Sequence, residues 1–329
     1  MIVDCHTHVF DSSVGGAREN FPKWPGTRWG GGAQDLLRQM GEAGIDRAFL
    51  ISYTPVDVMA HYPPEVRDDR LATFQHYLTR EYFVRTWQQY PDRFWWFSDS
   101  IDPRVPGYVE RAAQDLDRGA TGLKLLPSFV DTPIDDPGWQ PIFALLRDRR
   151  KPCIIDLSYW YMIRGPWFAP RMYGKYRDYA HYAEGVHRVA EAFPDVPMQF
   201  AHYGTPALRE PDDPTRTIHY DRLRGPIEMI RPHPNLYADL AAYQHFIAAD
   251  EPFPYWSALR IVEILVAELG ADRIIWGTDW PYLGQQPYPE LIRAIREAPF
   301  LKAAEADQIL GANALRLLGR RPEPVGRPV

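Results

Sequence analysis

The stretch "VDCHTHVF", at residues 3–10, places Asp4, His6 and His8 at alternate positions close to the beginning of the sequence. In an extended strand, residues two apart share a face, so one face would carry a carboxylate and two imidazoles. These groups are common ligands of zinc and related divalent metals. The same period places Cys5 on the opposite face, where we expect a core residue and not a ligand. The stretch therefore predicts a strand that leads from a hydrophobic core into a metal site.

Five further polar residues lie within or at the ends of short apolar runs, where charged groups are rarely buried unless they are paired or bound to metal. Each has a plain structural explanation. A lysine can pair with a structural carboxylate, a histidine can be a hydrogen-bonded core residue, and an aspartate can bind loop amides. Their recurrence at one end of several strands nevertheless favours metal-assisted chemistry. These residues are Lys124, Asp156, His202, Asp239 and Asp279.

Short apolar runs alternate along the chain with segments whose apolar residues recur at the helical period. Eight such βα units in 329 residues indicate an α/β fold of the (β/α)8 TIM-barrel class, with a doubly wound sheet as the competing architecture. The expected strands are residues 2–5, 47–52, 94–99, 122–127, 153–158, 198–202, 236–240 and 273–279. The expected helices are residues 33–44, 107–119, 141–150, 185–193, 222–231, 258–270 and 290–298.

The connections between these elements are uneven in length. Long segments follow the second, fifth, sixth and seventh strands, whereas the connections that lead into the second and eighth strands are short. In a barrel the long segments would all lie at the C-terminal face, where such loops build active sites. We therefore expect one barrel domain over residues 1–318, followed by a Pro- and Arg-rich tail over residues 319–329. The long segments are residues 53–80, 159–184, 203–221 and 241–257.

The composition argues against several classes of protein. The formal net charge is −6 and no basic block is present, so nucleic acid is not an expected partner. No apolar run reaches the roughly 18 residues that cross a bilayer, and the N-terminus lacks the pattern of a secretory signal. Cys5 and Cys153 are the only cysteines, which fits a cytoplasmic protein. We expect a small-molecule substrate as the partner, and a homodimer is an open alternative.

Several motifs, taken in order, resemble the amidohydrolase superfamily, and specifically its amidohydrolase-related branch, which includes aminocarboxymuconate semialdehyde decarboxylase-like enzymes. The motifs are "VDCHTH", "GLKLLP", "FAHYG", "HPNLYADL", "IIWGTDWP" and "ILGANALRLLG", and they extend over about residues 2 to 318. The resemblance implies a barrel of the metal-dependent hydrolase type with a divalent metal, usually zinc, in its mouth. It implies that His6 and His8 are metal ligands and that Asp279 is a ligand or transfers protons. It also implies that His202 is an acid/base or carbonyl-polarising residue.

One position departs from the pattern of that family. A histidine ligand is usual at the end of the fifth strand, whereas this sequence offers Asp156 within "KPCIIDLSYW". A carboxylate oxygen also binds zinc, and it suits manganese or iron as well. We therefore expect one divalent ion, Zn²⁺, with Mn²⁺ or Fe²⁺ as alternatives and Asp156 among its ligands. The departure leaves a metal-free site open. The resemblance also leaves open that Lys124 corresponds to the carbamylated lysine that bridges two metals elsewhere in the superfamily, but a single metal is favoured.

Two reactions fit these residues. We expect hydrolysis of a small carbonyl compound, such as a lactone or amide, by a metal-activated water, with Asp279 and His202 transferring protons. Non-oxidative decarboxylation of an aromatic or unsaturated carboxylic acid is the first alternative, and a barrel that binds without catalysis is the second. Aromatic and arginine side chains after the fifth strand could hold a flat, acidic ring, or they could pack between subunits. The expected substrate-binding residues are Lys124, Tyr159, Trp160, Arg164, Arg171 and Trp280.

Overall fold

Eight parallel strands form one sheet in the order β1 to β8, which confirms the predicted (β/α)8 barrel. This computed structural model describes residues 1–11, 31–52, 79–99, 101–128, 130, 132–157, 179–204, 208–209, 215–248, 250–281 and 286–320. The strands are β1 (Val3–Thr7), β2 (Arg47–Ile51), β3 (Phe94–Ser98), β4 (Gly122–Leu125), β5 (Cys153–Ile155), β6 (Met198–Phe200), β7 (Leu236–Asp239) and β8 (Ile274–Ile275). Each lies within a predicted strand or extends it by no more than two residues.

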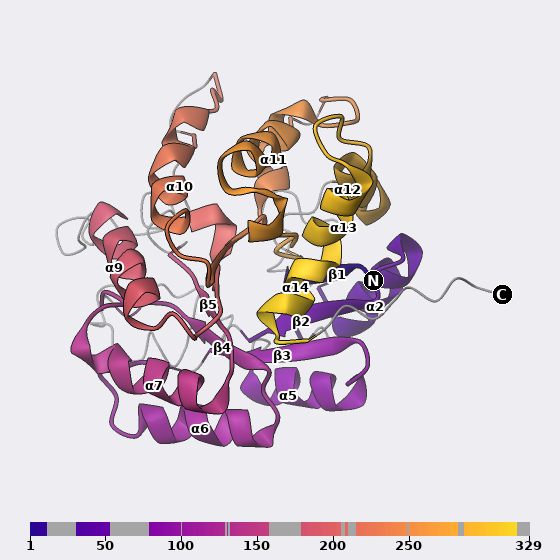
Figure 1. The fold of residues 1–329 in the computed structure, drawn as a ribbon. Helices are drawn as coiled ribbons and strands as arrows, with labels where there is room; N and C mark the ends of the chain where they lie inside the picture. The colour runs from indigo at the N-terminus through magenta and orange to yellow at the C-terminus, as the bar shows by residue number, and fades with distance from the viewer. Residues whose placement is uncertain are drawn as a thin grey trace.

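Helices surround these strands, and α6 lies beside α7 below the sheet in the view of Figure 1. All seven predicted helices are present. The structure adds a helix before β3 and three short helical segments at the end of the described chain. The helices are α2 (Ala33–Ala43), α5 (Arg80–Gln89), α6 (Tyr108–Arg118), α7 (Gln140–Arg149), α9 (Tyr179–Ala192), α10 (Arg224–Ile230), α11 (Trp256–Leu269), α12 (Tyr288–Arg296), α13 (Ala303–Asp307), the π-helix η9 (Gln308–Ala312) and α14 (Asn313–Leu317).

Alternation along the strands separates two hydrophobic layers. One layer faces the helices and includes Leu50 and Trp96, whereas the other fills the barrel interior and includes Phe49 and Trp95. The interior layer also contacts α14, which covers the end of the barrel opposite the predicted site. Polar residues replace apolar ones in the interior toward the C-terminal ends of the strands. The fold therefore brings Lys124, Asp156, Gln199 and Asp239 to one end of the barrel.

The predicted faces of β1 need a correction. Asp4 does not share a face with His6, because its carboxylate contacts Tyr288 of the surrounding helix α12. Cys5 is buried as predicted, but it lies with the interior layer and not with the outer one. The pairing of β1 with β2 shifts register between Asp4 and Thr7. Such an irregularity breaks the period of two, so Cys5 and His6 can both lie on the inner side.

The barrel closes where β1 meets the segment that follows β8. Thr7 forms a parallel bridge with Trp280, and the amide of Asp279 donates to the carbonyl of His6 at 2.7 Å. This closure brings the two motifs "VDCHTH" and "GTDWP" together from opposite ends of the sequence. Among the described residues, no helix is long and apolar enough to cross a membrane. The boundary of the predicted barrel domain stays a prediction, and residues 321–329 of the predicted tail lie outside the described residues.

Candidate metal centre

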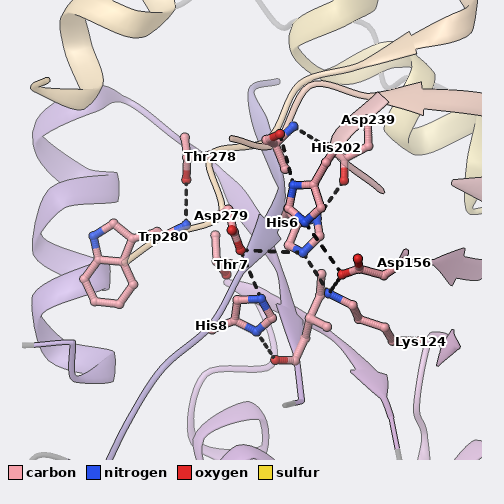
Figure 2. A network of polar contacts seen from close by, with 12 residues as sticks. His6, Thr7, His8, Lys124, Asp156, His202, Asp239, Thr278, Asp279 and Trp280 are labelled. Carbon is pink, nitrogen blue, oxygen red and sulfur yellow. Dashed lines mark hydrogen bonds and ion pairs between the residues drawn. The ribbon is translucent and has the colours of Figure 1, made fainter. Parts of the chain in front are cut away.

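The polar ends of β1, β4, β5, β6, β7 and β8 converge on one cluster, which Figure 2 shows at close range. His6 occupies its centre. Its Nε2 atom lies 2.9 Å from Nζ of Lys124 and 3.7 Å from Oδ1 of Asp279. His8 approaches the same carboxylate, with Nε2 at 3.2 Å from Oδ1 of Asp279. The ring of His202 lies 4.9 Å from that of His6, centroid to centroid. Three imidazoles and a carboxylate therefore share one small volume.

The hydrogen bonds of the three imidazoles fix their tautomers. His8 Nδ1 lies 2.9 Å from the carbonyl of Ile51, and His202 Nδ1 lies 3.1 Å from the carbonyl of Ala241. A carbonyl oxygen can only accept, so each Nδ1 donates. Nδ1 of His6 likewise donates to Asp239 at 2.6 Å. In the neutral rings, every Nε2 lone pair is therefore left to face the cluster.

Asp239 holds His6 in this orientation. Besides the imidazole, its carboxylate accepts from the Gln199 side chain at 2.8 Å and from the amide of Ala241 at 2.7 Å. Burial raises the pKa of Asp239 to about 7, while the charge of His202 and these hydrogen bonds oppose the increase. A carboxylate that accepts from the far nitrogen of an imidazole orients that ring and makes it a better metal ligand. Asp239 is thus built to support His6.

Lys124 and Asp156 form a buried ion pair beside His6. Their side chains are 2.7 Å apart, and both are almost fully buried. Burial alone would raise the pKa of Asp156, but the Lys124 ammonium, followed by His202, outweighs it and holds that pKa well below its usual range. Asp156 thus points inward, a direction that the sequence left open because a shift of one residue in the strand register would reverse it. Its Oδ2 atom lies 3.6 Å from Nε2 of His202.

The environments of His6 and His202 push their pKa values in opposite directions. Burial, reinforced by the Lys124 ammonium, holds the pKa of His6 well below its usual value, so this imidazole is neutral at pH 7. Burial also opposes the protonation of His202, but Asp156 and the other carboxylates prevail and raise the pKa of His202 to about 9. Two imidazoles with pKa values so far apart can take different roles in proton transfer.

The backbone is strained at two of the converging residues. His202, in the turn η5 (Ala201–Gly204), has φ 54°, and Asp279 has φ 61°. Positive φ is uncommon outside glycine, and it persists where the surrounding structure enforces it, often at functional sites. The bond from the Asp279 amide to the His6 carbonyl is one such constraint. These turns aim the two side chains into the barrel mouth.

The cluster fits a divalent metal ion. Donor atoms of His6, His202 and Asp279 all lie within 4.8 Å of one another. Zinc binds nitrogen at about 2.0–2.1 Å, so small shifts would bring these atoms onto one ion. The carboxylate of Asp279 also faces Nε2 lone pairs of His6 and His8, an arrangement of acceptors that a cation would stabilise. His8 is adjacent to this set, and Asp156 contacts it through Lys124 and His202.

Of the residues predicted to bind substrate, the structure places one, Lys124, in the cluster. Trp280 is buried, and its indole is directed away from the cluster in Figure 2, so in this structure it packs against the core. The remaining four lie outside the described residues: Tyr159, Trp160, Arg164 and Arg171.

Sequence analysis missed His245, which lies in the turn η7 (Tyr243–Phe246) after β7. Its side chain is exposed, yet the surrounding protein desolvates the imidazole and, with Arg209 and His202, lowers its pKa, while Asp279 opposes this. The effects of Asp279 and His202 on this pKa indicate that the imidazole lies within electrostatic range of the cluster. Arg209 also donates to the carbonyl of Phe246 at 2.7 Å, which holds it beside this turn. The sequence feature that could have identified His245 was its position in the long segment 241–257, which is expected at the C-terminal face of the barrel.

The close packing around His6 leads to a first prediction. A methyl group on Gly277 would lie 3.0 Å from Oδ1 of Asp239 and 3.0 Å from Cβ of His6. We expect Gly277→Ala to lower the free energy of unfolding by about 1–3 kcal/mol through overpacking, and to weaken metal binding by displacing the imidazole. Urea unfolding and a metal titration would measure both effects. Gly41→Ala is the control, because nothing lies within 4 Å of its added methyl group. Unchanged stability in Gly277→Ala would contradict the described packing.

A known protein family matches this sequence over nearly its whole length. The sequence profile described as amidohydrolase matches residues 3–320. The chain belongs to the amidohydrolase family. This confirms the resemblance drawn from the motifs, and it identifies the protein as an enzyme. A search of curated proteins found no significant match.

Solved amidohydrolase-family structures share the fold. A zinc-bound amidohydrolase from Burkholderia multivorans has 16% identity and a TM-score of 0.62, with 97% of this chain and 99% of that chain covered. A probable 2-pyrone-4,6-dicarboxylic acid hydrolase from Acinetobacter baumannii has 15% identity and a TM-score of 0.60, with 97% and 99% covered. A 5-carboxyvanillate decarboxylase from Sphingomonas paucimobilis has 17% identity and a TM-score of 0.58, with 97% and 99% covered. At these identities the likeness shows the fold alone.

Proposed function

We propose that this amidohydrolase-family protein is a metal-dependent hydrolase of small carbonyl compounds, such as lactones or cyclic amides. The observation that carries the proposal is the convergence of Nε2 atoms from His6, His8 and His202 with the Asp279 carboxylate. A divalent ion held there would supply Lewis acidity toward water and toward a carbonyl oxygen. We propose Zn²⁺ as that ion, with Mn²⁺ the first alternative, because relatives of this fold were solved with zinc and with manganese.

The residues of the chain itself would move the protons. Asp279 is the most accessible member of the set, with a side chain 14% exposed, so it can take a proton from an attacking water and deliver it to the leaving group. The Lys124 ammonium can donate a hydrogen bond to a developing oxyanion. His202 is the candidate for both ligand and proton donor, and the two roles exclude each other while its Nε2 atom is bound to metal.

The substrate is proposed to carry an acidic group. Arg209 bonds the turn that carries His245, and both Arg209 and Asp279 affect the pKa of that imidazole. A guanidinium can bind a carboxylate through two parallel hydrogen bonds. The probable 2-pyrone-4,6-dicarboxylic acid hydrolase that shares this fold is named for a substrate with two carboxylic acid groups. This similarity supports an acidic lactone as the first substrate to test.

Decarboxylation is the second candidate, because 5-carboxyvanillate decarboxylases share the fold. The same donor set would serve, with a proton delivered to the ring carbon that loses CO₂. Product analysis separates the two reactions. An acidic lactone and a hydroxylated aromatic acid are each incubated with zinc-loaded and manganese-loaded enzyme. Ring opening with no CO₂ supports the hydrolase, and CO₂ release from the aromatic acid would replace it with the decarboxylase.

Metal content is the direct test of the proposed centre. We expect about one ion per chain by mass spectrometry of the purified protein, and none in the His6→Ala/His8→Ala double variant. His187→Ala/His233→Ala is the matched control, because this second histidine pair, 2.7 Å apart, hydrogen-bonds away from the cluster. The proposal fails if the wild-type protein takes up neither zinc nor manganese on incubation.

We also propose that the protein works in the cytoplasm. Cys5 and Cys153 are free thiols, and both are buried. Free thiols without disulfides are typical of a reducing compartment. A homodimer stays a prediction, and sedimentation analysis would test it.

A further inference from the structure

Behind the metal centre lies a second buried polar group, which we name the Asp4 cluster and which consists of Asp4, Thr278 and Tyr288. All three residues are almost fully buried. Asp4 belongs to β1, Thr278 to the segment after β8, and Tyr288 to the start of α12. None of these side chains contributes a donor to the set formed by His6, His202 and Asp279. The burial of a carboxylate here therefore needs its own explanation.

The Asp4 carboxylate accepts four hydrogen bonds. Oδ1 accepts from the amide of Thr278 at 3.0 Å and from the amide of His6 at 3.2 Å. Oδ2 accepts from the hydroxyl of Thr278 at 2.6 Å and from the hydroxyl of Tyr288 at 2.8 Å. The Thr278 hydroxyl in turn accepts from the amide of Trp280 at 3.2 Å. One carboxylate thus connects backbone amides at or next to two of the converging residues, His6 and Asp279.

We propose that Asp4 is a positioning residue, whose carboxylate ties β1 to the segment after β8 and thereby sets the separation of His6 and Asp279. This inference rests on the proposed metal-dependent function. The direct bond between the Asp279 amide and the His6 carbonyl fixes the same two segments from the other side. Together, the two connections leave the Nε2 atom of His6 and the Asp279 carboxylate little freedom to move apart. Metal affinity depends on such fixed ligand geometry.

A purely structural role is the competing explanation. A buried carboxylate contributes little net stability, since a well-packed apolar group often stabilises as well. If Asp4 served stability alone, loss of one of its partners would lower the melting temperature and leave metal affinity unchanged. If Asp4 positions ligands, loss of a partner on α12 must weaken metal binding, although that partner supplies no ligand. Tyr288 is such a partner, and removing its hydroxyl deletes no ligand.

The experiment measures zinc affinity by competition with a chromophoric chelator, using the metal-stripped full chain. Tyr288→Phe is compared with Tyr243→Phe, a matched loss of a buried phenol hydroxyl. Tyr243 is buried in η7, and among the described residues its hydroxyl accepts one 3.4 Å hydrogen bond, from Trp276. We expect about tenfold weaker zinc binding in Tyr288→Phe, about 10–100-fold in Asp4→Asn, and no change in Tyr243→Phe. Circular dichroism at the assay temperature confirms that each variant is folded.

Each outcome decides between the alternatives. Wild-type zinc affinity in folded Tyr288→Phe, with a lowered melting temperature, would make the Asp4 cluster structural and overturn the inference while the proposed function stands. If Asp4→Asn fails to fold, Tyr288→Phe decides alone. Absence of zinc and manganese binding in the wild-type protein would overturn the proposed function, and the positioning role with it.

Discussion

Asp279→Asn is expected to lower kcat/KM about 10²–10⁴-fold on the lactone or aromatic acid that the wild-type enzyme converts. The amide cannot take a proton from water, and it is a weaker partner for a cation than the carboxylate. Asparagine tolerates positive φ, so the backbone at φ 61° should remain as it is. The reduction should therefore occur without loss of folding. Steady-state kinetics with saturating metal would measure it.

Asp115→Asn is the matched control for this prediction. Asp115 is an aspartate that is more deeply buried than Asp279, and it lies on α6, where it accepts from Ser98 and pairs with Arg80. Its replacement should lower stability and leave kcat/KM unchanged. Equal activity of Asp279→Asn and the wild-type enzyme would exclude Asp279 as the proton-transferring group.

Metal affinity is expected to increase about tenfold per pH unit from pH 6 to 8. The pKa of His202 is raised to about 9, chiefly by Asp156 against the opposing effect of burial, so the imidazolium predominates below that pH. A metal ion can bind Nε2 only after the proton leaves. The apparent association constant should therefore increase with slope one in log units and level off above pH 9. Chelator competition at several pH values would measure the slope.

Calorimetry provides an independent measure of the same proton. Titrations in two buffers with different ionisation enthalpies should show release of about one proton per metal bound at pH 7. His202→Gln should bind metal more weakly, and this dependence on pH should disappear. A flat profile for the wild-type protein would mean that His202 remains protonated beside Asp156 and acts as a proton donor instead of a ligand.

Hydrophobic alternation made the barrel predictable, because each strand carries apolar residues on one or both faces and the segments between strands repeat their apolar residues at the helical period. The direction of Asp156 stayed open, because a shift of one residue in register reverses it, and only its contact with Lys124 shows that it faces inward. The faces of Asp4 and Cys5 did not follow, because the register shift in β1 arises from pairing with β2. Such a shift depends on tertiary contacts that a single strand does not encode.

Some residues around the cluster also could not be predicted from the sequence. Gln199 is an uncharged residue in an apolar strand, and nothing in "MQFAH" indicates that its amide would reach Asp239. His245 resembles any loop histidine until η7 places it near Asp279. The donors that carry charge could be predicted because a charge inside an apolar run is costly. Asp239, which orients His6, was among them, whereas the uncharged Gln199 could not be predicted because its role appears only once the barrel has closed.

A descendant of this protein that no longer needed its chemistry could relieve backbone strain by placing glycine at position 279. His202, Tyr203 and Asp279 all have positive φ, and glycine adopts that backbone without strain. At the buried His202 and Tyr203, the cavity left by the side chain would offset this relief, so the gain remains at the partly exposed Asp279. Mutation supplies such changes continually, so homologous barrels with glycine at the equivalent of Asp279 should be non-catalytic. The residue at this strained position would therefore distinguish working enzymes from inactive copies in the same genome.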